Sequence, residues 1–168
     1  MEVFGVGDRI SISTTTVETL FPGMLNVPGI VGLGEACRLR QLEMIEDERA
    51  IAAKRDRMQA QLMKGIPGLV INGDMDNRLA GNLHISIPGI PNSAVIVRVR
   101  HQLAISTGSA CSSGVEEPSH VLTAMGLPDD IVEGSLRIGL GKFTTDDEVE
   151  RASEILITEV KAIRALLT

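Results

Sequence analysis

The sequence predicts an α+β fold in which a small, mostly antiparallel sheet is packed by helices. Short runs with alternating or β-branched apolar residues suit strands, and they are mixed irregularly with longer segments of good helix formers. Neighbouring strand candidates are not all separated by helices, so a regular strand–helix–strand succession is not favoured. With 168 residues and 43% hydrophobic content, the chain has enough apolar side chains for one core but little room for two full domains.

The N-terminal part divides into an irregular segment and a helical one. Residues Met1–Gly23 mix Gly, Thr and Ser without a sustained period, which predicts an extended arm or an edge strand. From Pro28 to about Lys64 most residues are good helix formers, and opposite charges recur at helical spacings. We expect one long helix or two consecutive ones, ending near Gly65 and Pro67.

The central part holds three strand candidates, which are Leu69–Asn72, Asn82–Pro88 and Leu103–Thr107. The first ends in a predicted turn at Asn72-Gly73-Asp74. In the second, the apolar residues alternate and would face one side of a sheet: Leu83, Ile85 and Ile87. The segment Ala94–Val99 is ambiguous, because its β-branched residues favour a strand whereas the preceding Asn92 and Ser93 suit a helix cap.

Three elements are predicted near the C-terminus. Pro118–Met125 fits a short helix stopped by Gly126, and Ser135–Leu140 fits a strand. Thr145 followed three positions later by Glu148 matches a capping box at the start of a long helix. The apolar face of that helix would consist of Val149, Ile155, Leu156, Val160 and Ile163.

Composition excludes several classes of function. A net charge of -6 and a pI near 5.1 argue against general affinity for nucleic acid or anionic membranes. No stretch approaches the roughly 20 apolar residues that span a bilayer, and no secretory signal is evident, so we expect a cytoplasmic protein. The two cysteines, Cys37 and Cys111, are too few and too far apart for a disulfide scaffold or a zinc site.

A loop of small residues surrounds one of the two cysteines. Residues 106–114 are almost free of bulky side chains, so a thiol at Cys111 would be accessible on a flexible loop. The alternative is that Cys111 is a small packing residue in a turn, and composition alone favours it. No cation lies within the loop, and Arg137 or His120 are the candidates that could lower the thiol pKa from elsewhere in the fold. Cys37 lies in a helical run without polar support and is expected to be a core residue.

The residues after this loop follow a specific order. Ser109-Ala110-Cys111-Ser112 is followed by Glu117-Pro118-Ser119-His120, then by Ser135-Leu136-Arg137-Ile138 and Gly141-Lys142-Phe143. In order and spacing this region resembles the C-terminal part of the cysteine desulfurases. Upstream motifs are similar to that family as well, so the resemblance covers residues 23–168 as one domain and leaves 1–22 as an unrelated N-terminal segment. The upstream motifs are Asn26-Val27-Pro28, Asn72-Gly73-Asp74 and Asn82-Leu83-His84-Ile85-Ser86.

The resemblance implies the small domain of a fold-type-I pyridoxal-phosphate enzyme, and it favours a helix at 94–100. It implies that Cys111 is the nucleophile that takes sulfur from cysteine and carries it as a persulfide. Arg137 matches the arginine that binds the substrate carboxylate, where a planar guanidinium pairs with two oxygens. The alternative for Arg137 is an ordinary strand arginine paired with Asp or Glu. His120 is weaker as a candidate, because a histidine on a helix surface is usually just solvated.

The sequence also departs from the family pattern. In the family, pyridoxal phosphate is bound by a lysine within a Ser-x-His-Lys segment of a larger domain that precedes this one. None of the four lysines in this sequence has that context. They are Lys54, Lys64, Lys142 and Lys161. The family's base histidine and its aspartate partner of the pyridine nitrogen have no match either. Gly23-Met24 replaces a Gly-Thr whose hydroxyl reaches the cofactor phosphate, and a thioether cannot donate that hydrogen bond.

Three hypotheses about function follow. The chain could be the sulfur-carrying half of a desulfurase system that needs a partner, either a full-length desulfurase or a chain bearing pyridoxal phosphate. It could instead be a noncatalytic module for docking or oligomerisation, or a relic. A sulfur acceptor such as an iron–sulfur scaffold protein would be a second partner, and exposed apolar surface would favour a homo-oligomer. Retention of both Cys111 and Arg137 favours the first hypothesis.

Overall fold

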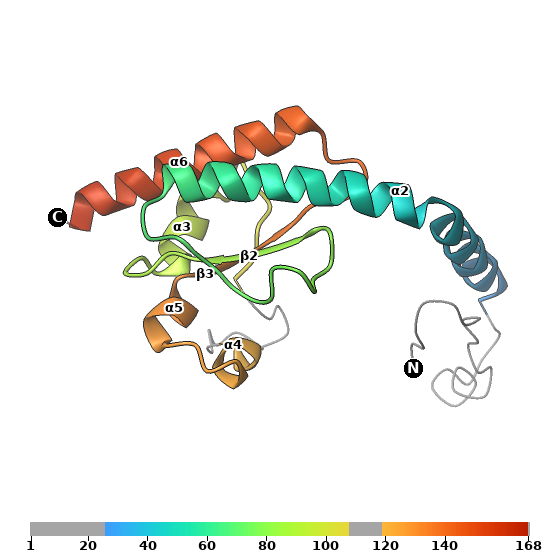
Figure 1. Ribbon diagram of the computed structural model, residues 1–168, viewed down its shortest axis with the longest axis horizontal. Helices are drawn as coiled ribbons and strands as arrows, with labels where there is room; N and C mark the ends of the chain where they lie inside the picture. Colours follow the sequence, from blue (N-terminus) through green and yellow to red (C-terminus); the bar gives the residue numbers. More distant parts are fainter. Residues whose placement is uncertain (1–25, 108–118, 168) are drawn as a thin grey trace. The chain divides into compact units, whose positions relative to one another are not determined.

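The computed structural model describes residues 26–107 and 119–167 (Figure 1). The chain forms two compact units, residues 1–43 and 44–168, and the predicted boundary between residues 22 and 23 lies outside the described residues. The first element in the description is α2, which begins in the first unit and ends in the second. In chain order the elements are α2 (Val27–Gly65), β1 (Val70–Ile71), β2 (Asn82–Ser86), α3 (Asn92–Val99), α4 (His120–Ala124), α5 (Asp129–Glu133), β3 (Ser135–Gly139) and α6 (Asp146–Leu167).

In the first unit, the described part is the N-terminal portion of α2. Its start is capped by Asn26, whose side-chain Oδ1 accepts the Gly29 backbone N–H at 3.1 Å. Most side chains from residue 27 to 43 are exposed. Cys37 is only half-buried there, so the expectation that it is a core residue was wrong. The sequence pattern was misleading because the buried residues of α2 begin only at Ile51.

In the second unit, the described strands form a three-stranded antiparallel sheet in the order β1-β2-β3. The strand pattern of alternating residues predicted for 82–88 is confirmed, and Leu83, Ile85 and Ile87 are fully buried. Leu83 lies opposite Ile138, and Ile85 lies opposite Leu136. Because side chains of directly opposed residues lie on the same sheet face, these four residues make one apolar face.

Helices complete the core over that face. The core cluster combines the apolar strand residues with residues of α2, α3 and α6, and Figure 1 shows α6 and the second-unit part of α2 on one side of the strands, with α4 and α5 on the other. The helical members of the cluster are Ile51, Met58 and Leu62 of α2, Val95 and Val99 of α3, and Val149, Leu156, Val160 and Ile163 of α6. Four of the five residues predicted for the α6 face are therefore buried, and Ile155 is partly buried against the same core.

The predicted capping box at the start of α6 is confirmed. The Glu148 backbone N–H donates to Thr145 Oγ1 at 3.2 Å, and the Thr145 backbone N–H donates to Glu148 Oε2 at 2.8 Å. That bond to the carboxylate, together with one from the Thr145 hydroxyl, lowers the pKa of the Glu148 carboxyl. Gly126 ends α4 with a φ of 73°, as its predicted role as a helix stop requires.

One segment agrees with the family resemblance and another differs from its prediction. The run Ala94–Val99 belongs to α3, which confirms the helix that the resemblance favoured at 94–100, and its N-cap is Pro91, without a side-chain capping bond, rather than Asn92 or Ser93. The predicted strand Leu103–Thr107 is reduced to an isolated bridge between Ser106 and Arg137. Within this segment Ser106 alone pairs with β3, so the succession of paired residues that defines a strand is not formed.

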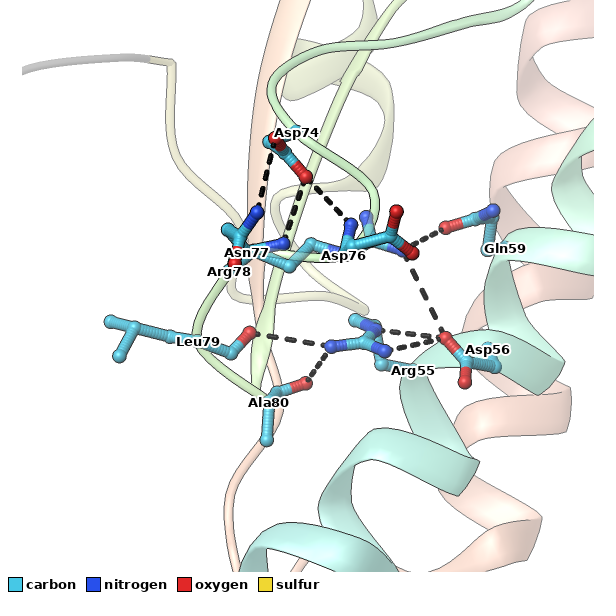
Figure 2. A network of polar contacts seen from close by, with 9 residues as sticks. All are labelled: Arg55, Asp56, Gln59, Asp74, Asp76, Asn77, Arg78, Leu79 and Ala80. Atoms are coloured by element: carbon cyan, nitrogen blue, oxygen red, sulfur yellow. Dashed lines mark hydrogen bonds and ion pairs between the residues drawn. The ribbon is translucent and has the colours of Figure 1, made fainter.

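The connection between β1 and β2 is fastened to α2 by a polar network (Figure 2). The buried Arg55 donates to the carbonyl oxygen of Ala80 at 3.1 Å and forms an ion pair with Asp56 at 2.7 Å. Arg78 donates to Gln59 Oε1 at 2.8 Å. Charge-assisted bonds of this kind hold the connection in place and thereby support the position of β2, which carries residues of the candidate site.

Among residues 26–107 and 119–167, no helix has an apolar stretch long enough to span a bilayer.

Candidate functional site

Arg137 lies in the middle of β3, with a neighbour on each side. On one side it is opposite His84 of β2. On the other side its backbone N–H donates to the Ser106 carbonyl oxygen at 2.7 Å, and its carbonyl oxygen accepts the Ser106 N–H at 3.2 Å. Ser106 precedes Cys111 by five positions in the sequence. The segment that leads into the small-residue loop is therefore hydrogen-bonded to the strand of Arg137.

The guanidinium of Arg137 is directed away from the core. The residue is exposed, whereas its neighbours Leu136 and Ile138 are buried in the apolar face. No Asp or Glu among residues 26–107 and 119–167 forms an ion pair with it. The alternative of an ordinary strand arginine with a carboxylate partner thus gains no support from the described part of the chain, and the planar fork of donors is available for a ligand.

A polar cluster lies beside Arg137 on the same face. His84 Nδ1 is 3.0 Å from Asn72 Nδ2, and Asn72 Nδ2 donates to Ser86 Oγ at 2.7 Å. Asn72 follows β1, and its backbone N–H donates to the His84 carbonyl oxygen at 2.9 Å. Asn72 and Ser86 are buried, and His84 is partly exposed. Within the cluster, His84 is therefore an accessible titratable group, and it is supported by the buried side chains of Asn72 and Ser86.

The electrostatics of His84 reflect this position. Partial burial, and then the nearby positive charge of Arg137, hold the pKa of His84 below its usual value of 6.5. The imidazole is therefore neutral at pH 7 in the absence of an anion. A neutral histidine beside an arginine without an acidic partner is an arrangement that suits a negatively charged ligand.

The predicted site residues are distributed as follows. Cys111 and the loop 108–114, expected to be flexible, lie outside the described residues, so the access and mobility of the thiol stay predictions. His120 begins α4 and is exposed, as expected for a solvated histidine. The His84 and Asn72 contacts were missed by sequence reasoning. The alternation in β2 did place His84 on the face opposite the core, but only the register of β2 and β3 shows that Arg137 is its neighbour.

Comparison with known proteins identifies the family. The aminotransferase class-V family matches residues 5–152. The chain belongs to this family. The match begins within residues 1–22, for which no resemblance was expected, and the assignment of that segment stays a prediction. The resemblance to cysteine desulfurases in the loop and strand motifs agrees with the names of the similar curated proteins, which include cysteine desulfurases.

Two relatives and one solved structure illustrate the match. A cysteine desulfurase IscS from an Anaeromyxobacter species is 39% identical over 144 residues, which are 86% of this chain and 35% of that protein. A cysteine desulfurase from Mus musculus is 37% identical over 86% of this chain and 31% of its own length. The X-ray structure of a NifS-like protein from Rickettsia africae has a TM-score of 0.74 at 25% identity and covers 92% of this chain and 40% of that one.

This class-V chain spans about a third of the length of these cysteine desulfurase relatives. The structural similarity confirms the α+β class with a small antiparallel sheet. The activity, substrates and partners of a whole relative are therefore proposals for this chain.

The lysines bear on whether this class-V chain can anchor pyridoxal phosphate, whose Schiff base needs an available lysine amine. Lys54 Nζ donates to the Thr144 carbonyl oxygen at 2.5 Å, and Lys142 Nζ pairs with Asp47 at 3.1 Å. The other two lysines are exposed on helices, Lys64 on α2 and Lys161 on α6. All four therefore lie outside the strands that carry the polar cluster.

Proposed function

We propose that this chain handles sulfur in a cysteine desulfurase system, with Cys111 as the persulfide-carrying thiol and Arg137 as the residue that binds the substrate carboxylate. The observation that carries the proposal is the backbone pairing of Arg137 with Ser106, because it holds the start of the Cys111 segment beside an arginine without a carboxylate partner among the described residues. The names of the relatives support the reaction class.

The sulfur-transfer step balances without any added oxidant. The Cys111 thiolate attacks the outer sulfur of a donor persulfide R–S–SH, a bond forms between Cys111 Sγ and that sulfur, and the donor's S–S bond breaks. Its electron pair leaves with the inner sulfur of the donor as a thiolate. Passing the sulfur on to an acceptor thiol repeats the exchange, with Cys111 Sγ as the leaving thiolate. An iron–sulfur scaffold protein is the kind of acceptor we propose.

We propose that turnover of cysteine itself requires a partner that bears pyridoxal phosphate. The support for this proposal is that none of the four lysines lies in the Ser-x-His-Lys context of the family, and that all four lie outside the strands of the polar cluster. Such a partner would hold the cofactor, and this chain would contribute the thiol and the carboxylate-binding arginine. The partner is either a full-length desulfurase or a chain that carries the cofactor-binding domain.

The first experiment tests Cys111 as a carrier. The native chain, Cys111→Ser and Cys37→Ser are treated with a low-molecular-weight persulfide, and the labelled peptides are resolved by mass before and after addition of a thiol acceptor. We expect Cys111 to take up sulfur and pass it on, and Cys37→Ser to retain this transfer. Cys37 is half-buried and serves as the internal control for general thiol reactivity. Equal transfer from both cysteines, or none from Cys111, would contradict the proposal.

The second experiment tests the need for a partner. The pure chain is incubated with cysteine and pyridoxal phosphate, with and without a full-length desulfurase whose own loop cysteine has been replaced by serine, and sulfide and alanine are measured. We expect no turnover by the chain alone, because no lysine has the sequence context in which the family anchors the cofactor. A spectral change alone is not diagnostic, since surface lysines also react with the aldehyde. Release of sulfide by the pure chain that depends on both the cofactor and Cys111 would refute this expectation.

A docking or oligomerisation module is the second candidate, and a specific observation favours it. In the first unit, α2 exposes large apolar side chains along its length, with exposed fractions from 41% for Leu39 to 71% for Leu42. The other members of this surface are Val27, Ile30, Val31 and Leu33. Apolar surface of this extent on a helix is characteristic of a protein interface. We propose that it mediates self-association or pairing with the cofactor-bearing partner, which sedimentation of the chain alone and mixed with that partner would test.

A further inference from the structure

We propose that His84 is a second binding residue for the carboxylate that Arg137 receives, and that Asn72 is the positioning residue that orients its ring. The inference rests on the proposed role of Arg137 and extends it by a neighbouring residue on another strand. It predicts that carboxylate binding and protonation of His84 are linked.

The sheet register places the two side chains together. His84 and Arg137 are directly opposed in the antiparallel pairing of β2 with β3, so their side chains leave the sheet on the same face with Cβ atoms about 5 Å apart. Both are long enough to reach one small ligand above that face. Arg137 has no ion-pair partner among the described residues, so its donors are not committed elsewhere in that part of the chain.

Asn72 determines which nitrogen of His84 is presented. Its amide Nδ2 lies 3.0 Å from His84 Nδ1, and a donor at that position requires an unprotonated Nδ1 in the neutral ring. The proton of the neutral ring is then on Nε2, the nitrogen farther from the sheet. Asn72 is itself only 7% exposed and is braced by Ser86. The ring thus presents an N–H donor next to the guanidinium.

The same amide can accommodate the protonated ring. Protonation adds a hydrogen to Nδ1, which then needs an acceptor. Asn72 Oδ1 is buried and has no hydrogen-bond partner within residues 26–107 and 119–167, and rotation of the amide by half a turn would direct it toward Nδ1 and Ser86 Oγ. Asn72 can therefore form a hydrogen bond with either protonation state of the His84 ring, whereas an apolar side chain could form one with neither.

The charges of Arg137 and of a carboxylate ligand explain why ligand binding would be linked to protonation of His84. Among the residues that the structure describes, the charged group that acts on His84 is Arg137 on β3, and from the β1 side the neighbour is the neutral amide of Asn72. In the free protein, partial burial and then the charge of Arg137 lower the pKa of His84. A carboxylate held between the two side chains would neutralise the arginine and favour the imidazolium, so binding should raise that pKa. By linkage, affinity should then rise as the pH falls through the pKa of His84.

The test follows the ring resonances of the three histidines by NMR, in pH titrations of the full chain. The probe is L-alanine, and L-alaninamide, which lacks the carboxylate, is the matched control. We expect L-alanine to raise the pKa of His84 by about one unit, which corresponds to about tenfold tighter binding at low pH. L-Alaninamide should leave it unchanged, and His101 and His120, which are exposed, should not respond to either compound.

Variants separate the contributions of the two residues. Arg137→Ala should raise the pKa of His84 in the ligand-free chain and abolish the response to L-alanine. His84→Gln keeps a donor near the Nε2 position but cannot titrate, so it should bind L-alanine with an affinity that no longer varies across this pH range. His101→Gln is the matched control and should behave like the native chain.

The outcomes either support or overturn the inference. The inference is overturned if L-alanine leaves the pKa of His84 unchanged. This result would mean either that Arg137 alone binds L-alanine or that nothing binds it. A His84 pKa that is insensitive to Arg137→Ala also overturns the inference. Failure of the proposed function is distinguishable, because Cys111→Ser should keep the L-alanine response. Loss of persulfide transfer in the native chain with a retained pKa response refutes the proposed role of Cys111 and leaves that of His84 intact. Retained transfer without the pKa response refutes the role of His84 and leaves that of Cys111 intact.

Discussion

The two faces of the sheet differ in role, although both are formed by alternate residues of the same strands. One face packs into the core, and the other carries the residues of the candidate site. On β2 and β3, Leu83, Ile85, Leu136 and Ile138 are almost completely buried under helices. On the opposite face the same strands carry His84 and Arg137, which have polar neighbours and partial or full exposure. Because successive residues of a strand point to opposite faces, one register fixes both the core and the candidate site.

Because the two faces share one register, a slip of the register would damage both at once. Shifting β3 by one residue relative to β2 would place Arg137 against the apolar face and separate it from His84. The core therefore enforces the placement of Arg137, although it makes no contact with a ligand. Substitutions on the two faces should consequently differ in kind, with effects on stability from one face and on binding from the other.

The largest effect on stability is expected on the apolar face. Ile85→Ala removes a fully buried side chain from the middle of β2 and should lower the free energy of unfolding by about 3 kcal/mol, from lost burial and the remaining cavity. Asn82→Ala, at an exposed position of the same strand, is the matched control, and urea unfolding is the measurement. Similar losses for both variants would mean that the apolar face does not dominate the stability of the sheet.

A smaller effect is expected where the polar face is buried. Asn72→Ala removes the donor to His84 Nδ1 and Ser86 Oγ and should cost about 1–2 kcal/mol, because the buried Ser86 hydroxyl loses its partner. Asn77→Ala, whose side chain donates to Asp74 in an exposed turn, should change stability by less than about 0.5 kcal/mol. A neutral Asn72→Ala would show that this cluster does not hold β1 against β2.

The pH dependence of stability should report on His84. Its pKa is lowered in the folded chain by partial burial and by Arg137, so the unfolded chain binds the proton more readily. The stability contributed by the neutral ring is then complete above the unfolded pKa of 6.5 and is lost as the pH falls toward the folded pKa. His84→Gln should flatten this decline, whereas His101→Gln should retain it. An unchanged decline in His84→Gln would assign it to other groups.

The smallest effect on stability is expected at Arg137. Its side chain is exposed and makes no ion pair within the described residues, so Arg137→Ala should change the free energy of unfolding by less than about 0.5 kcal/mol. It should also leave persulfide exchange at Cys111 largely intact, since that step involves no carboxylate. A large loss of exchange, measured by peptide mass, would mean that Arg137 instead lowers the pKa of the thiol.

Elements whose signals are local could be predicted from the order of residues alone. The capping box of α6 is such an element, because Thr145 and Glu148 are three residues apart and satisfy each other's backbone groups within one helical turn. The same holds for the buried alternation of β2 and for the helix stop at Gly126, since each depends on the chain within a few residues. The resemblance to cysteine desulfurases likewise came from the order of residues along the chain, and the family match agrees with it.

Features that depend on segments far apart in the chain became visible in the folded molecule alone. Whether 103–107 is a strand and whether Cys37 is buried depend on which segments pack against each one, and the chain nearby does not encode this. The neighbourhood of Arg137 is the clearest case. His84 and Ser106 lie 53 and 31 positions before it in the sequence, and the strand register alone brings them to its two sides. Register is determined by the fit of the whole apolar face under its helices, a property that no local pattern of residues contains.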